Sequence, residues 1–395
     1  MIKFKQLFKN KPFLGYLLLV VTFSLLFIFV ERNNEKLFTS DLKVYFEATR
    51  DFFNGNSPYV KSYGIDTGFF KYPPTTLLLF SPFGLNSFGF FQFVHLAILV
   101  ISLVIAIPLW KSLLTNQFGL TKRNTLLLIL SFIVIVIHVT RELHLGNINL
   151  VLLLFFIIGM YFLNKKNSLI AMVFWSLMVV LKPIMILVFL PLLFWGYIKE
   201  VGYLAVFGLL YFFVPSFFFG WSENLVLWKD WLQAISAHGE YLRSPHSLQY
   251  LIQTYVGYPH SWWPSLLGLL VLLMIMVLER VKQKVSFKSF FIWTILFMAF
   301  IPNFFITDTQ HFLLSIPLIM YLLYSCIQTN KLMYWLLFGI GMACFSFDSM
   351  DLWGRTLSTL IYEKGVLGIG NLIFIVSALY VWSKQKSVDA ASYNL

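Results

Sequence analysis

A series of apolar runs, each long enough or nearly long enough to cross a lipid bilayer, constrains this chain more than any other feature. A helix that crosses the hydrocarbon core needs about 20 mainly apolar residues. The runs lie at about 13–30, 88–110, 124–140, 147–163, 168–182, 184–196, 201–219, 263–279, 289–306, 309–327, 332–347 and 365–382. They predict an all-α polytopic membrane protein with about 12 transmembrane helices, organised as a single integral-membrane domain over residues 1–395. The stretch 168–196 is either one long helix or two short ones broken at Lys182-Pro183, and the broken reading leaves both termini on one side.

The few charged residues indicate which segments face the cytoplasm. Only 12% of the residues are charged, and 29 basic residues outnumber 17 acidic ones. When both termini are placed inside, the inside segments hold 17 of the basic residues and three of the acidic ones. This asymmetry follows the positive-inside rule, so the net charge of +12 is a signal of topology. Because the basic residues are spread over separate short loops, no nucleic-acid partner is expected. The first apolar run lacks a small-residue cleavage site and is predicted to be a retained span.

Three long segments fall on the predicted outer side, at 31–87, 220–262 and 348–364. The first contains an amphipathic stretch over residues 40–54, with apolar side chains at helical spacing, and this pattern predicts a helix lying in the membrane interface. Thr39 or Ser40 is a candidate cap for its start. Pro74 is expected to begin a second helix that is too short to span the membrane.

Charged residues near the ends of apolar runs are costly to place, and each is therefore a candidate for function. Asp41 falls in the first turn of the predicted interface helix, where a carboxylate can accept a proton from a hydroxyl or can simply stabilise the helix start. Lys182 ends an apolar helix and is either functional or extends to the interface. Asp308 and His311 open a later span, where His311 can also act as a helix cap. With Lys71, all are predicted on the outer face.

A second polar group, Arg141, Glu142 and His144, is expected to interrupt a short outer turn after the third span. Arg141 and Glu142 can also form a local ion pair. Asn147 and Asn149, just beyond them, are either functional or simply form hydrogen bonds across helices. The chain has no phosphate-binding loop, dinucleotide-binding glycine pattern, nucleophile elbow or His/Cys metal-ligand cluster. A nucleotide-driven pump or an enzyme with a soluble cofactor is therefore not expected.

The order of these motifs along the chain resembles glycosyltransferase family 87, over about residues 13–330. The motifs that carry the resemblance are Asp41 with Tyr45 and Ala48, Gly55-Asn56-Ser57-Pro58-Tyr59, Phe70-Lys71-Tyr72-Pro73-Pro74, Gly146-Asn147-x-Asn149, Leu181-Lys182-Pro183 and His311-Phe312-Leu313-Leu314-x-x-Pro317. One departure is Asn147, because many relatives carry Gly-Gln-x-Asn at this point. The resemblance implies a GT-C-type glycosyltransferase fold and an inverting transfer of a hexose, mannose in the family. The sugar would pass from a polyprenyl-phosphate donor to a hydroxyl of a glycolipid or glycan.

Roles for individual residues follow from the same resemblance. Asp41 would be the catalytic base, since a phosphate ester leaves without strong acid catalysis but the acceptor hydroxyl must lose a proton. The candidates for binding the donor's phosphate or sugar are Lys182 and His311, which are preferred, and Arg141, Lys71, Tyr59, Tyr72 and Asn147. No metal and no other cofactor is expected.

The expected partners are therefore the lipid-linked donor, the acceptor and membrane lipids. The expected location is a bacterial cytoplasmic membrane, with both termini in the cytoplasm and the site facing outside. Two alternatives stay open at this point. One is a transporter or lipid flippase, which would use charges within the membrane as a substrate path. The other is a GT-C enzyme that uses a different polyprenyl-phosphate sugar, such as an aminosugar or arabinose.

Overall fold

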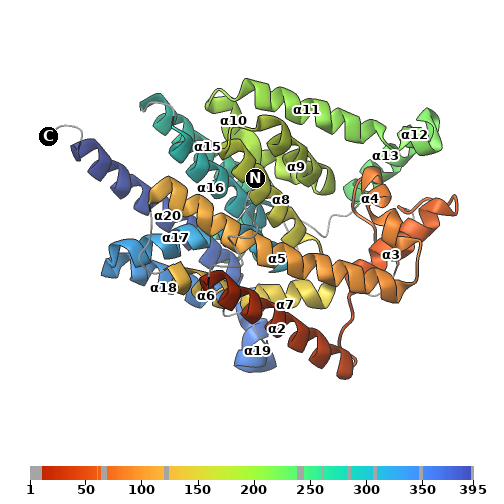
Figure 1. The fold of residues 1–395 in the computed structure, drawn as a ribbon, viewed down its shortest axis with the longest axis horizontal. Helices are drawn as coiled ribbons and strands as arrows, with labels where there is room; N and C mark the ends of the chain where they lie inside the picture. The colour runs from red at the N-terminus through yellow and green to blue at the C-terminus, as the bar shows by residue number, and fades with distance from the viewer. Residues whose placement is uncertain are drawn as a thin grey trace.

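The chain folds almost entirely into helices in a computed structural model (Figure 1). The structure describes residues 11–59, 61–63, 69–119, 124–237, 244–259, 261–282, 286–305, 309–346 and 350–392. These ranges contain no strand, only one isolated antiparallel bridge between Ser62 and Phe69. Asp308 and the basic N-terminal segment 1–10 lie outside the described residues.

Within the described residues, seven helical segments are long and apolar enough to cross a membrane. They are α2 (Lys11–Asn33), α5 (Phe88–Phe118), α11 (Ile198–Phe213) with α12 (Ser216–Phe219), α15 (Trp263–Lys282), α16 (Phe287–Phe305), η3 (Thr309–Ser315) with α17 (Ile316–Thr329), and α20 (Val366–Ser392). An eighth is formed if α6 (Asn124–Ile133) and α7 (Val136–Leu145), which meet at a 53° bend, are one span. The protein is thus an integral, multi-pass membrane protein, as predicted.

Four shorter apolar segments complete the set of predicted runs. They are α8 (Asn149–Asn164), α9 (Ser168–Leu181), η1 (Pro183–Phe189) with α10 (Leu190–Phe194), and α18 (Leu332–Ser346). The predicted number of about 12 spans requires that all of them cross the bilayer, and that number stays a prediction. The stretch 168–196 is broken at Lys182. A residue before proline is disfavoured in the α conformation, and Lys182 is extended, with φ −139° and ψ 98°.

The centre of the bundle is formed by α16 and by η3 with α17, each 83% buried over its most apolar window, whereas α2 is only 22% buried. Beside this centre, α8 packs between α5 and α9. A Cβ at Gly159 would lie 2.1 Å from Trp175 Nε1, so only glycine allows α8 and α9 to approach this closely. Trp175 Nε1 also donates to the Phe156 carbonyl at 3.1 Å. These contacts fix the positions of the first residue of α8 and of the residue that follows α9.

The shorter non-spanning helices are α3 (Ser40–Phe53), α4 (Pro74–Gly84), α13 (Trp221–Ala237), α14 (Leu248–Val256) and α19 (Met350–Glu363). In Figure 1, α3, α4, α12 and α13 gather at one end of the molecule, and the C-terminus lies at the other. The predicted helix over 40–54 is confirmed as α3, which is followed by Asn54 and Gly55, whereas its position in the membrane interface stays a prediction. The predicted side-chain cap is wrong, because Thr39 adopts a left-handed conformation and its hydroxyl instead accepts a bond from Gln92 Nε2 at 2.8 Å.

The three segments predicted on the outer side contact one another. Ser57 donates to Asp230 Oδ2 at 3.0 Å, which joins the first segment to the second. Tyr255 donates to the Lys364 carbonyl at 2.9 Å, which joins the second segment to the residue that follows α19. Their mutual contact supports one shared face. Which side of the bilayer this face occupies stays a prediction.

One predicted turn is wrong. Arg141, Glu142 and His144 do not interrupt the chain, because α7 continues to Leu145. The helix ends only at Gly146, whose φ of +71° is a left-handed conformation that favours glycine. All three polar side chains are therefore presented from a helix, and the turn of interest begins one residue after it.

Candidate active site

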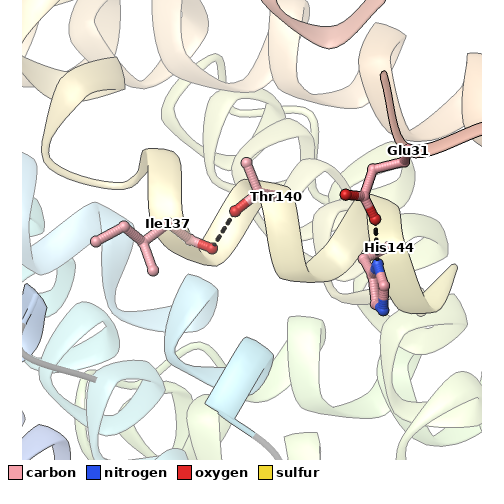
Figure 2. A network of polar contacts seen from close by, with 4 residues as sticks. All are labelled: Glu31, Ile137, Thr140 and His144. Atoms are coloured by element: carbon pink, nitrogen blue, oxygen red, sulfur yellow. Dashed lines mark hydrogen bonds and ion pairs between the residues drawn. The ribbon is translucent and has the colours of Figure 1, made fainter. Parts of the chain in front are cut away.

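The turn from Gly146 to Asn149, between α7 and α8, is packed against the start of α3. A Cβ at Gly146 would lie 2.9 Å from Leu42 Cβ, so this close approach also requires glycine. The end of α7 is tied to α2 as well: Figure 2 shows His144 and Glu31 pointing toward each other, with 2.7 Å between Nδ1 and Oε2. The backbone N–H of Thr39 donates to the His144 carbonyl at 2.9 Å. The ends of α2 and α7 and the start of α3 therefore form one supported unit.

Asn147 joins this turn to Asp41. Its side-chain Nδ2 donates to Asp41 Oδ2 at 2.7 Å. Its Oδ1 accepts the backbone N–H of Ile148 at 2.7 Å, and since that N–H can only donate, the amide must present Nδ2 to Asp41. His95 Nε2 lies 3.1 Å from the Asn147 carbonyl. Asn147, which is 4% exposed, thus holds the Asp41 carboxylate as a hydrogen-bond acceptor.

Three tyrosines extend the Asp41 side of the site. The Tyr72 hydroxyl lies 2.8 Å from the Tyr45 hydroxyl and makes a longer contact of 3.4 Å with Asn147 Oδ1. Tyr59 donates to the Tyr72 carbonyl at 2.9 Å. Burial, together with nearby Tyr72 and Asp41, raises the pKa of Tyr45 well above its ordinary value. Tyr45 therefore stays a neutral hydroxyl beside the carboxylate.

Lys182 and His311 form the second half of the site. Lys182 leaves the end of α9 in extended conformation, and its Nζ lies 2.5 Å from Nε2 of His311, which is presented by η3. The same Nζ donates to Asn149 Oδ1 at 2.9 Å. An ammonium has no acceptor, so a protonated Lys182 requires His311 Nε2 to be the unprotonated nitrogen. The two preferred candidates for donor binding are thus in contact, and their role in binding the donor stays a prediction.

Glu142 completes the polar chain behind Lys182. Its Oε2 accepts from Asn149 Nδ2 at 2.9 Å, and its Oε1 accepts the backbone N–H of Leu150 at 3.1 Å. The side chain is fully buried. Its two hydrogen bonds both run to α8.

The two charged residues of the site are more exposed than the residues that hold them in place. Asp41 and Lys182 are partly exposed, whereas Glu142, Asn147 and Asn149 are buried. Asn147 contacts Asp41 and Asn149 contacts Lys182, and the two asparagines are two residues apart in one turn. The turn thus brings an anionic acceptor and a cationic donor to the same region, which suits a reaction in which a proton leaves one group while negative charge grows on another.

Other predicted residues lie elsewhere in the structure. The backbone carbonyl of Lys71 accepts from Trp231 Nε1 at 3.0 Å, which places this residue at the contact between the first and second outer segments. Arg141 interacts electrostatically with His138 and His246. The described residues contain no group of three or more potential metal-ligating side chains, and independence from a metal stays a prediction.

Comparison with known families decides the class of protein. The family model of glycosyltransferase family 87 matches residues 69–302, more than half of the chain. The chain belongs to glycosyltransferase family 87. A search of curated proteins finds no match. The family segment includes Tyr72, Asn147 and Lys182, while Asp41 and His311 lie outside it on either side. As a membrane member of a glycosyltransferase family, the protein transfers a sugar from a donor to an acceptor, which favours an enzyme over the transporter alternative.

Proposed function

We propose that this glycosyltransferase transfers a hexose, mannose in the first instance, from a polyprenyl-phosphate sugar to a hydroxyl of a glycolipid or glycan on the outer face of the membrane. The observation that carries the proposal is the turn Gly146–Asn149, which supports Asp41 on one side and the Lys182–His311 pair on the other. A base and a phosphate-binding cation are the two groups that such a transfer needs.

The proposed reaction is a single displacement with inversion. The acceptor oxygen attacks the anomeric carbon and forms the new glycosidic bond, while the bond from that carbon to the phosphate oxygen breaks. Asp41 takes the proton of the acceptor hydroxyl, and the electron pair of the broken bond leaves with the polyprenyl phosphate. Asn147 supports this role because its N–H bond favours the ionised carboxylate that a base must be.

Lys182 and His311 are proposed to bind the phosphate of the donor. Charge grows on that phosphate as the bond to the sugar breaks, so a fixed ammonium stabilises the transition state more than the ground state. The partial exposure of Lys182 supports this role, because a substrate must be able to reach the cation. Tyr59 and Tyr72 are proposed to line the sugar side of the site, close to Asp41 through the Tyr72–Asn147 contact.

The remaining parts of the proposal extend the family assignment. A GT-C-type fold with about 12 spans is proposed, with both termini in the cytoplasm of a bacterium and the site facing outward. The mutual contacts of the three predicted outer segments support a common face for the site. Neither a metal nor another cofactor enters the proposed reaction, and transfer is expected to persist in the presence of a chelator.

The test is an assay of the purified protein with a panel of polyprenyl-phosphate sugars and membrane glycolipid acceptors. Release of polyprenyl phosphate and formation of a product with inverted anomeric configuration are expected with one donor. Turnover with a soluble nucleotide sugar and with no lipid-linked donor would overturn the donor class. The variant Asp41→Asn is expected to lower transfer by about 10²–10⁴-fold, the range of general base catalysis, while binding of polyprenyl phosphate is retained. Near wild-type transfer by this variant would remove Asp41 from the role of base.

A further inference from the structure

The buried carboxylate of Glu142 has no role in the proposed reaction, yet a series of hydrogen bonds connects it to Lys182. The chain runs from Glu142 through the Asn149 amide to Lys182, with N···O distances of 2.9 Å at both steps. A buried charge is expensive unless it is paired and hydrogen-bonded. The position of this carboxylate therefore calls for a reason beyond the stability of one helix.

The hydrogen-bonding groups of Lys182 and Glu142 allow only one orientation of the Asn149 amide between them. The Lys182 ammonium can only donate, so it must meet the amide oxygen. An ionised Glu142 can only accept, so it must meet the amide nitrogen. Both Glu142 oxygens accept N–H groups, from Asn149 and from Leu150, as an ionised carboxylate allows. Each end of the chain thus reinforces the orientation that the other end requires.

We propose that Glu142 is a positioning residue for donor binding: through Asn149 it fixes the Lys182 ammonium at the place where the phosphate of the lipid-linked donor binds. The inference rests on the proposed assignment of Lys182 to that phosphate. Glu142 does not touch the substrate in this account. When Glu142 is ionised, its negative charge also favours the charged form of the partly exposed Lys182, so the cation is in place before the donor arrives.

The rival explanation is that Glu142 only caps α8. Its bond to the Leu150 N–H satisfies a donor in the first turn of that helix, and a negative charge is favourable at a helix N-terminus. A cap alone would change stability but would leave the phosphate affinity of Lys182 unchanged. The two explanations therefore differ in a binding measurement and not only in activity.

The experiment measures binding of a long-chain polyprenyl phosphate, without sugar, to the full-length protein in nanodiscs. The set of proteins is the wild type, Glu142→Gln, Glu142→Asp, Asn149→Ala, Lys182→Ala and the double variant Glu142→Gln with Lys182→Ala. Glu142→Gln can offer its own NH₂ to Asn149 and so permits the amide to turn over. It is expected to weaken binding about tenfold, an effect on donor KM more than on kcat, and Glu142→Asp is expected to recover part of the loss because it keeps the charge.

The double variant separates the explanations. If Glu142 acts through Lys182, its replacement adds no further loss of affinity once Lys182 is absent, because contacting residues in one network are not additive. A matched control is Asn167→Ala, which removes the side-chain cap at the opposite end of α9, about 20 Å from Lys182 by helix rise. The control is expected to lower thermal stability with unchanged affinity.

Failure of the proposed role of Lys182 can be distinguished from failure of the inference about Glu142. Unchanged affinity in Lys182→Ala would overturn the phosphate assignment, and with it both the proposed function of Lys182 and this inference. Weakened binding in Lys182→Ala, together with unchanged affinity in Glu142→Gln, would overturn only the inference and leave Glu142 as a cap. Losses that simply add in the double variant would lead to the same conclusion, since they would show an effect that does not pass through Lys182.

Discussion

The side-chain amide of Asn147 donates to the Asp41 carboxylate at 2.7 Å and bridges 106 residues of sequence. The opposite side of the amide is held by the Ile148 N–H at 2.7 Å, so the orientation does not depend on Asp41. Asp41 is therefore held by a rigid donor that is itself part of a turn. A carboxylate held in this way keeps its place and its charge before the acceptor arrives, which is how a fixed site avoids reorganisation during the reaction.

Replacement of Asn147 by alanine is expected to lower kcat about 10–100-fold, because a base displaced by about 1 Å loses catalytic efficiency. Asn147→Gln retains an amide and is expected to keep more activity than Asn147→Ala. The check is steady-state transfer with saturating donor, together with thermal stability. Tyr72→Phe is the comparison, since it leaves the bond from Asn147 to Asp41 in place. It removes the Tyr72 hydroxyl with its 3.4 Å contact to the same amide and its 2.8 Å contact to Tyr45, and it is expected to change kcat by a few-fold at most. Equal activity of Asn147→Ala and wild type would show that the bond does not position the base.

Gly146 is expected to tolerate no side chain. An alanine there meets both a left-handed φ of +71° and a Cβ contact of 2.9 Å with Leu42, so it must displace the start of α3 and with it Asp41. Strain of this kind costs about 1–3 kcal/mol, and transfer should fall as well. The matched control is Gly55→Ala, where φ is +80° but no atom lies within 4 Å of the added Cβ. Gly55→Ala should lose stability through backbone strain alone, and comparable transfer by the two variants would contradict the role of the close contact.

His246 is expected to make stability depend on pH. It lies in the loop before α14, where burial and the nearby Arg141 lower its pKa to about 3 from an ordinary 6.5. The unfolded chain therefore binds a proton between about pH 6.5 and pH 3 while the folded protein does not, so the free energy of unfolding falls as the pH drops through this window. The measurement is the unfolding temperature from pH 7 to pH 4.5.

The variant His246→Phe provides the control for that measurement. A phenyl ring can keep the edge contacts that His246 makes with Phe312 and Tyr362, at centroid distances of 5.8 and 5.0 Å, but it cannot be protonated. Its unfolding temperature should decline less with falling pH than that of the wild type. Parallel curves for the two proteins would mean that His246 does not contribute to the acid sensitivity.

The helices could be predicted from the sequence because a long run of apolar residues is itself the signal of a membrane helix. Asp41 and Lys182 were accessible for the opposite reason, since a charge in so apolar a chain is conspicuous. The break at Lys182 could be predicted from Pro183, because proline restricts the residue before it. These features are all local, and each depends on residues that are neighbours in the sequence.

The partners of the charged residues were not accessible in the same way. Lys182 and His311 are 129 residues apart, and only the packing of η3 against α8 and α16 brings them together. The sequence predicts Glu142 in a turn because polar residues separate the third apolar run from the fourth. In the folded chain two N–H donors from α8 satisfy it inside the bundle. Asn149 carries no charge and gave only a weak signal, although it contacts both Glu142 and Lys182.

The contact between Lys182 and His311 leads to two further predictions, the first of them on Lys182. Lys182→Arg keeps a positive charge but replaces a compact ammonium with a planar fork, which cannot reproduce the 2.9 Å bond to Asn149 and the 2.5 Å contact to His311 from one atom. Transfer by Lys182→Arg is expected to fall about 10-fold or more. Transfer by Lys182→Met, which removes the charge, is expected to fall about 10²–10³-fold, the loss seen when one hydrogen-bond donor to the transition state is removed.

Two variants of His311 test whether this side chain acts by accepting a hydrogen bond from Lys182 or only by filling space. His311→Gln can place an oxygen near the position of Nε2 and so still accept from Lys182, whereas His311→Ala cannot. His311→Gln is therefore expected to retain more transfer than His311→Ala, with both variants folded. The measurement is kcat/KM for the lipid-linked donor, alongside the affinity for polyprenyl phosphate. If His311→Ala matched the wild type in both quantities, the Lys182–His311 contact would have no part in holding the phosphate, and Lys182 would have to act with Asn149 alone.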